Sequence, residues 1–65
     1  MHDNYGTARG RIATLFYRWQ YGTIGKFDFY GETMRHRPST IAEVTGIDID
    51  VIRDRRAYLR HLEKH

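Results

Sequence analysis

The 65-residue chain contains no cysteine. This absence excludes a disulfide framework and thiolate metal sites, which stabilise many small secreted domains, and it favours a cytoplasmic setting. No apolar run approaches the roughly 18–20 residues that a membrane span requires, and the segment from Met1 to Tyr5 lacks the pattern of a signal peptide. We therefore expect a soluble protein with no membrane partner.

Catalytic motifs are also missing. The sequence has no nucleophile motif and no paired carboxylates in an apolar setting, and Gly22-Thr-Ile-Gly25 is too short for a phosphate loop and lacks its lysine. His61 and His65 have a spacing of four residues that can bind a metal, but the sequence offers no third ligand. We expect no enzymatic activity, no metal site and no cofactor.

The length and the charge set further bounds. A chain of 65 residues forms one domain, here residues 1–65, and buries only about 60% of its unfolded surface, so a dimer or a binding partner is expected. The net charge is +3 with a pI near 9.6, and nine of the eleven basic residues are arginine. This modest excess is compatible with nucleic acid but also occurs in many small soluble domains.

The segment from Thr40 to Ile52 has the spacing of a helix-turn-helix. Ala42 is small enough for the point where two helices cross, and Gly46, four residues later, allows the chain to leave the first helix with a positive φ. Ile52, six residues after Gly46, is placed to fill the angle between the helices. These three residues form the predicted motif core, and Ile41, Val44 and Ile47 supply its remaining apolar contacts.

Start signals flank both helices of this motif. Ser39 or Thr40, directly after Pro38, is expected to cap the first helix, with Glu43 three residues after Thr40 as in a capping box. Asp48 is the expected N-cap of the second helix, and Asp50 lies in its first turn, where the helix dipole favours a carboxylate.

The run Thr40-Ile-Ala-Glu-Val-Thr-Gly-Ile, followed by Val51-Ile-Arg53, resembles the motif of small bacterial and phage helix-turn-helix regulators, with some likeness to the MerR and excisionase branch. The resemblance covers about a third of the chain. It implies that the second helix enters the major groove of DNA and presents its early residues to base edges. By motif position, these residues are Asp48, Ile49, Asp50, Arg53, Asp54 and Ala57.

Three of these six residues are aspartates, which phosphate groups repel. Capping explains Asp48, and the helix dipole explains Asp50, although either carboxylate can also accept a hydrogen bond from a cytosine amino group. Arg53 is the best candidate for guanine recognition, and Ile49 for contact with a thymine methyl group.

The segment from Val51 to His65 combines a basic stripe with an apolar face. On a helical wheel, Arg53, Arg56, Arg60 and Lys64 fall within about 80° of one another. The expected phosphate contacts are Arg35, Arg37, Ser39, Thr40, Arg56 and Arg60. A solvated helix face is the alternative explanation of the stripe. The adjoining apolar face comprises Val51, Ile52, Tyr58, Leu59 and Leu62, with Arg55 in its middle, as expected for a snorkelling or ion-paired residue at a subunit contact.

The N-terminal third predicts an amphipathic helix that serves as core or as a dimer seam. Its apolar residues recur every three or four positions: Tyr5, Ala8, Ile12, Leu15, Phe16 and Trp19. The segment from Tyr21 to Arg37 is harder to assign, because Lys26 to Tyr30 fits either the start of a helix or a strand of a small hairpin. We favour the helix.

These patterns predict a compact all-α domain of three or four helices that contains a helix-turn-helix. The expected helices are Thr7–Tyr21, Phe27–Arg35, Thr40–Thr45 and Ile49–Glu63.

The leading functional hypothesis is sequence-specific binding of double-stranded DNA. The protein would be a homodimeric transcriptional regulator of phage or mobile-element type, such as a repressor. A protein with this function would be associated with the nucleoid. The alternative is a protein-binding module that uses the same scaffold to engage a larger protein. The acidic first turn of the second helix supports this alternative, and its expected aromatic anchors are Tyr17, Tyr21, Phe29 or Tyr30.

Overall fold

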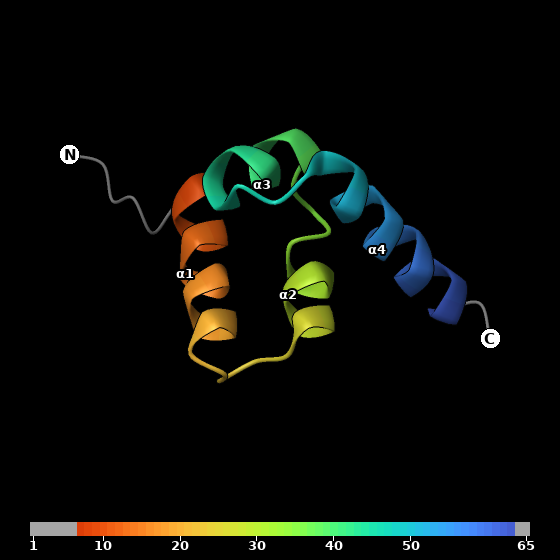
Figure 1. The fold of residues 1–65 in the computed structure, drawn as a ribbon, viewed down its shortest axis with the longest axis horizontal. Helices are drawn as coiled ribbons and strands as arrows, with labels where there is room; N and C mark the ends of the chain where they lie inside the picture. Colours follow the sequence, from red (N-terminus) through yellow and green to blue (C-terminus); the bar gives the residue numbers. More distant parts are fainter. Residues whose placement is uncertain (1–6, 64–65) are drawn as a thin grey trace.

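Four helices form within residues 7–63, the part of the chain that the computed structural model describes (Figure 1). They are α1 (Ala8–Gln20), α2 (Lys26–Glu32), α3 (Pro38–Thr45) and α4 (Ile49–Glu63). These residues contain no strand, so the all-α prediction is confirmed and the hairpin alternative for residues 26–30 is wrong.

Helices α1 and α2 form a helical hairpin, and α3 and α4 pack on it. Helices α1 and α2 lie side by side, α3 crosses their far end, and α4 runs down along the outer side of α2 (Figure 1). Helix α3 contacts both α1 and α4, and α2 likewise contacts both. Each helix therefore presents one face to a shared interior.

The core collects side chains from all four helices. Five apolar side chains are buried: Ile12, Phe29, Tyr30, Ile41 and Ile52. The rings of Phe16 and Trp19 lie with their centroids 5.8 and 5.2 Å from the ring of Phe29. Full burial of an aliphatic or aromatic side chain contributes about 1.5–3 kcal/mol, so this small cluster supplies most of the cohesion between the helices. The N-terminal apolar stripe is therefore core, except that Ala8 is exposed and Tyr5 lies outside the described residues.

Local hydrogen bonds explain where α1 and α2 begin. Thr7 is the N-cap of α1, and its Oγ1 accepts a hydrogen bond from the Gly10 N–H at 3.1 Å. At the start of α2, the Asp28 Oδ2 accepts a hydrogen bond from the Gly25 N–H at 2.9 Å. Both contacts satisfy main-chain donors near a helix start.

Helix α2 ends three residues before the predicted end at Arg35. Its C-cap is Thr33, a buried residue whose hydroxyl donates to the Phe29 carbonyl at 2.8 Å. The carbonyl of Thr33 accepts a hydrogen bond from the His36 N–H at 2.9 Å, within a turn that follows the helix, and a second one from Arg56 of α4 at 2.8 Å. A tertiary contact thus supports the end of α2, which local propensity does not reveal.

Helix α3 begins two residues earlier than predicted. Arg37 is its N-cap and Pro38 occupies the first turn, with no side-chain capping bond, so the predicted cap at Ser39 or Thr40 is wrong. Proline is favoured at this position because its fixed φ suits a helix and its missing N–H needs no partner there. Glu43, the expected capping-box residue, forms an ion pair with Arg9 of α1 instead.

Candidate nucleic-acid interface

The turn between α3 and α4 has the predicted geometry. Gly46 adopts a φ of 79° and its N–H donates to the Ala42 carbonyl at 2.9 Å, which ends α3. Two residues later, the Asp48 Oδ1 accepts a hydrogen bond from the Asp50 N–H at 2.8 Å, at the start of α4. The predicted roles of Gly46 and Asp48 are confirmed, and the chain contains a helix-turn-helix in the geometrical sense.

The motif core is also in the expected place. Ile52 is fully buried between the two helices, and Ala42 is half-buried against the same cluster. Ile41 is buried, while Val44 and Ile47 pack at the edge of the core. The arrangement fixes α4 relative to α3 and leaves one long side of α4 open to solvent.

The predicted base-reading residues lie on this open side of α4. Asp50, Arg53, Asp54 and Ala57 are exposed and Ile49 is half-exposed. An Arg53 Nη1 lies 3.9 Å from an Asp50 carboxylate oxygen, with both side chains well exposed, so this pair contributes less than about 1 kcal/mol. Arg53 is therefore easily released to another anion.

The open side of α4 has two distinct flanks. At about 100° per residue, Ile49, Arg53 and Arg60 fall within about 40° of one another on one flank. Asp54 and Ala57 instead lie toward the other flank, where they line a groove with Tyr58 and His61. The structure thus separates the six residues that the motif resemblance groups together.

Arg56 is not available to a phosphate, which corrects the sequence-based assignment. Its side chain is only 6% exposed. Its Nη2 donates one hydrogen bond to the Thr33 carbonyl at 2.8 Å and another to the His36 carbonyl. Burial, and then the nearby Arg60, lower the pKa of Arg56 from its ordinary value. The helical wheel misses this role because Nη2 of the guanidinium donates to main-chain carbonyls of another segment.

These two hydrogen bonds draw the segment between α2 and α3 against α4 and gather cations there. Burial lowers the pKa of His36, and the charges of Arg11, Arg35 and Arg56 lower it further, so these side chains lie close enough to interact. Arg11 comes from α1 and has no role in the predicted motif. Its proximity to His36 results from the packing of α1 and is not visible in the spacing.

We call the set Arg11, Arg35, Arg37, Arg53 and Arg60 the basic face. All five side chains are exposed. Among residues 7–63, only Arg53 of this set forms an ion pair with a carboxylate. Ser39 is exposed and Thr40 half-buried in the first turn of α3, beside Arg37, while Lys64, predicted to extend the stripe, lies outside the described residues.

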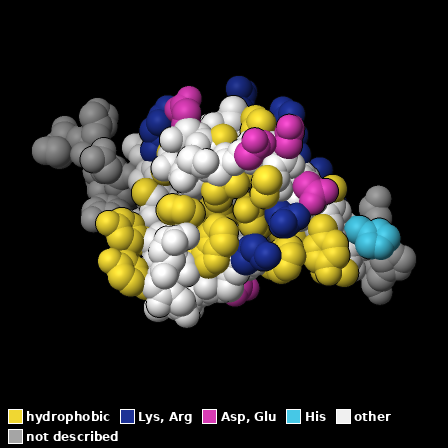
Figure 2. Space-filling view, viewed as in Figure 1, with side chains coloured by type: hydrophobic (Ala, Val, Ile, Leu, Met, Phe, Trp, Pro, Cys, Tyr) yellow, Lys and Arg dark blue, Asp and Glu magenta, His cyan; other side chains and the backbone are white. Residues whose placement is uncertain are grey.

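Apolar and acidic side chains occupy other parts of the surface. In Figure 2, carboxylates and cations alternate over the α3 and α4 end, above a band of apolar surface. The apolar face predicted for α4 is only partly correct, because Val51, Tyr58 and Leu62 are exposed while Ile52 and Leu59 pack inward.

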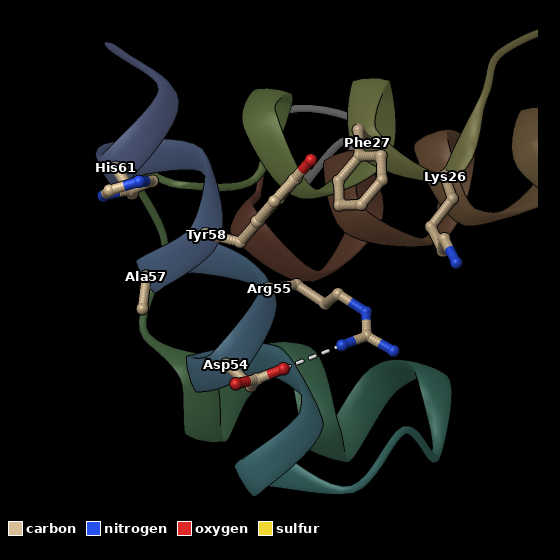
Figure 3. Close-up of a pocket in the computed structure, with 7 residues that line it drawn as sticks. All are labelled: Lys26, Phe27, Asp54, Arg55, Ala57, Tyr58 and His61. Atoms are coloured by element: carbon tan, nitrogen blue, oxygen red, sulfur yellow. Dashed lines mark hydrogen bonds and ion pairs between the residues drawn. The ribbon is translucent and has the colours of Figure 1, made fainter. Parts of the chain in front are cut away.

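A groove between α2 and α4 lies on the flank opposite Arg53. Its lining residues are Lys26, Phe27, Asp54, Arg55, Ala57, Tyr58 and His61 (Figure 3). The rings of Phe27 and Tyr58 contact each other with centroids 5.2 Å apart, and they remain 40% and 48% exposed. Arg55 donates to the Asp54 Oδ2 at 2.8 Å, as expected for an ion-paired residue. We call this surface the aromatic groove.

The other predicted aromatic anchors divide into two classes. Phe29 and Tyr30 are buried in the core, which corrects their assignment as interface anchors. Tyr17 and Tyr21 are exposed on α1 and stack on each other with centroids 5.6 Å apart.

No three His, Cys, Asp or Glu side chains within residues 7–63 are placed to hold a metal ion, and His65 lies outside this range. In the same range, none of the helices combines the length and the apolar composition that crossing a bilayer requires. The chain matches no model of a known protein family, no curated protein and no solved structure.

Proposed function

We propose that this protein binds double-stranded DNA through its basic face and acts as a small sequence-specific transcriptional regulator of phage or mobile-element type. The observation that carries the proposal is the set of exposed arginines on α1, the α2–α3 connection and one flank of α4, four of them with no carboxylate partner in residues 7–63. Cations held close together at a cost in repulsion favour a polyanion, because each neutralised phosphate adds to affinity.

The proposal gives the residues of this face separate roles. Arg35, Arg37 and Arg60 contact phosphates, and Arg11 joins them as a contact from α1. The exposed Ser39, in the first turn of α3, adds a hydroxyl donor beside Arg37. These contacts position the duplex along the flank of α4 that carries Arg53.

Base reading falls to Arg53 and Ile49, which share the flank of Arg60. Arg53 exchanges its weak, exposed contact with Asp50 for the acceptor edge of a guanine, and Ile49 contacts a thymine methyl group. Asp54 and Ala57 have no base-reading role in this proposal because they line the aromatic groove. Asp50 serves to orient Arg53 in the absence of DNA.

The test is fluorescence anisotropy with labelled duplex DNA, first of random sequence and then selected from a random library, at several salt concentrations. We expect affinity to fall steeply with salt, and Arg35→Ala and Arg60→Ala each to reduce the salt slope by about one. Arg53→Ala is expected to cost about 1–3 kcal/mol and to relax base preference at one position.

Lys26→Ala is the matched control, because it removes one exposed positive charge from the aromatic groove instead of the basic face. It is expected to leave the salt slope unchanged. Absence of binding at low salt would reject the DNA proposal, and equal effects of Lys26→Ala and Arg60→Ala would show that only net charge matters.

A further inference from the structure

We propose that the aromatic groove binds a second copy of this chain, by antiparallel packing of α4 against α4. The inference concerns the flank of α4 opposite Arg53 and does not depend on DNA binding. It is carried by the exposed ring pair, by the distribution of charge along α4 and by the symmetry that these two features permit.

An exposed stripe runs along α4 and continues the groove toward the start of the helix. At about 100° per residue, its members fall within about 120° of one another: Asp50, Val51, Asp54, Ala57, Tyr58 and His61. Val51 and Tyr58 of this stripe are 38% and 48% exposed. The stripe therefore offers two apolar contacts about 10 Å apart along the helix, given its rise of about 1.5 Å per residue.

Charge divides this stripe into two complementary halves. The first half carries the exposed carboxylate of Asp50, and the exposed Asp48 directly precedes the helix. The second half, with the groove, carries Lys26, whose Nζ lies 5.4 Å from the centroid of the Phe27 ring. In Figure 3, the side chains of Lys26 and Arg55 extend on the same side of the Tyr58 and Phe27 rings. The second half, with its cation and its exposed rings, fits a ligand that has carboxylates beside an apolar side chain. The first half of the same stripe, with Asp50 beside Val51, is such a ligand.

A twofold dimer uses both halves at once. When two α4 helices pack antiparallel about a centre between Asp54 and Arg55, Val51 of one copy faces Tyr58 of the other. Asp54 then faces Arg55 of the other copy, and Asp50 approaches Lys26 beyond the ring pair. Because a twofold interface repeats every contact, each complementary pair occurs twice. Parallel packing would instead place carboxylates against carboxylates.

The predicted interface is small and polar at its edges, and both properties limit the affinity of the dimer. One pair of short helices buries less than the roughly 1,200–2,000 Å² of stable complexes, so we expect a weak, reversible dimer that salt weakens. The basic face stays exposed, because Arg53 and Arg60 lie on the other flank of α4.

Sedimentation velocity over a wide range of protein concentration tests this inference. The wild-type protein is expected to show a monomer–dimer equilibrium at low salt. Lys26→Glu and Asp50→Lys alter exposed side chains, and each is expected to weaken the dimer about tenfold or more, because each places like charges together. The double variant K26E/D50K is expected to recover most of the wild-type affinity, since the pair is restored with reversed sign.

Tyr17→Asp is the control, because it adds a carboxylate at an exposed aromatic residue of α1, away from the groove. We expect it to leave the dimer intact, whereas Tyr58→Asp abolishes it. Circular dichroism confirms that each variant remains folded. A wild-type protein that stays monomeric at millimolar concentration and low salt overturns the inference. A dimer that Tyr17→Asp disrupts and Tyr58→Asp spares also overturns it, as does a double variant no stronger than its parents.

Discussion

The guanidinium of Arg56 in α4 donates a hydrogen bond of 2.8 Å to the main-chain carbonyl of Thr33, the residue that ends α2. The same Nη2 also reaches the carbonyl of His36. A single side chain therefore satisfies two carbonyls in a segment that has no regular structure. This contact determines where the α2–α3 connection lies, and with it where Arg35 and Arg37 are presented.

Replacement of Arg56 by methionine is predicted to destabilise the fold. Methionine retains an apolar stem but removes the side-chain donor to the His36 carbonyl and one of the two donors to the buried Thr33 carbonyl, which keeps the His36 N–H. The expected loss is about 1–3 kcal/mol of unfolding free energy, the cost of one abandoned buried acceptor. Urea unfolding followed by the fluorescence of Trp19, the single tryptophan, measures it. Arg60→Met, at an exposed position, serves as the control and should change stability by less than about 0.5 kcal/mol.

Two glycine-to-alanine substitutions are predicted to act in opposite directions. Gly46→Ala should destabilise by about 1–2 kcal/mol, because Gly46 has a φ of 79° that a residue with a Cβ adopts only at a cost. Gly31→Ala should stabilise by about 0.5–1 kcal/mol, because Gly31 lies inside α2 and a Cβ there meets no atom within 4 Å. Thermal unfolding of the two variants beside the wild type is the measurement. Stabilisation by Gly46→Ala would contradict the role given to Gly46, and destabilisation by Gly31→Ala would contradict the room assigned to a side chain at Gly31.

Removal of the carboxylate of Asp48 is predicted to weaken the start of α4. Asp48→Ala takes away the acceptor for the Asp50 N–H and should cost about 1 kcal/mol. Asp48→Ser retains a capping oxygen and should recover most of this loss. Denaturant midpoints of the two variants provide the comparison, and equal midpoints would show that the cap contributes nothing.

The stability of the fold is predicted to depend on the protonation of His36. Burial, and then Arg11, Arg35 and Arg56, lower the pKa of His36 below its ordinary value of 6.5. Between the lowered pKa and 6.5 the unfolded chain binds more protons than the folded one. The unfolding free energy therefore rises with pH through this window and reaches its full value above about pH 6.5. As the pH falls toward the lowered pKa, this contribution is lost.

Nuclear magnetic resonance titration of the His36 Cε1 proton measures this pKa directly. Arg11→Ala and Arg35→Ala should each raise it toward 6.5, because each removes a positive charge that opposes protonation. The His36→Gln variant should lack the corresponding part of the pH dependence of urea unfolding. A His36 pKa at or above 6.5 in the wild type would contradict the proximity of these cations.

Much of the fold was predictable because its signals are local. The positive φ at Gly46 and the cap at Asp48 follow from residue types whose own backbone and side-chain chemistry dictates the turn. The burial of Ile12 and Ile52 follows from helical spacing. Helix α4 has the bounds that were predicted, because both its cap and its periodicity are written in consecutive residues.

The errors concern residues whose partners come from other helices. Helical spacing assigned Arg56 to a solvated stripe, yet its guanidinium donates to the carbonyls of Thr33 and His36, which are 23 and 20 residues away in sequence. Glu43 had a local capping role available, yet it pairs with Arg9 of α1. Tyr58 has the spacing of a core residue, but its ring contact with α2 is to Phe27, which is itself exposed, so Tyr58 stays exposed as well.

The sequence by itself determined the helix-turn-helix, its core and its net positive charge, because capping, periodicity and composition act within short stretches of chain. Only the tertiary structure decided which side of α4 carries which chemistry. The packing of α2 against α4 buries Arg56 and creates the aromatic groove, and the packing of α1 brings Arg11 toward His36. These features depend on contacts between residues that are distant in sequence, and no local sequence pattern signals such contacts.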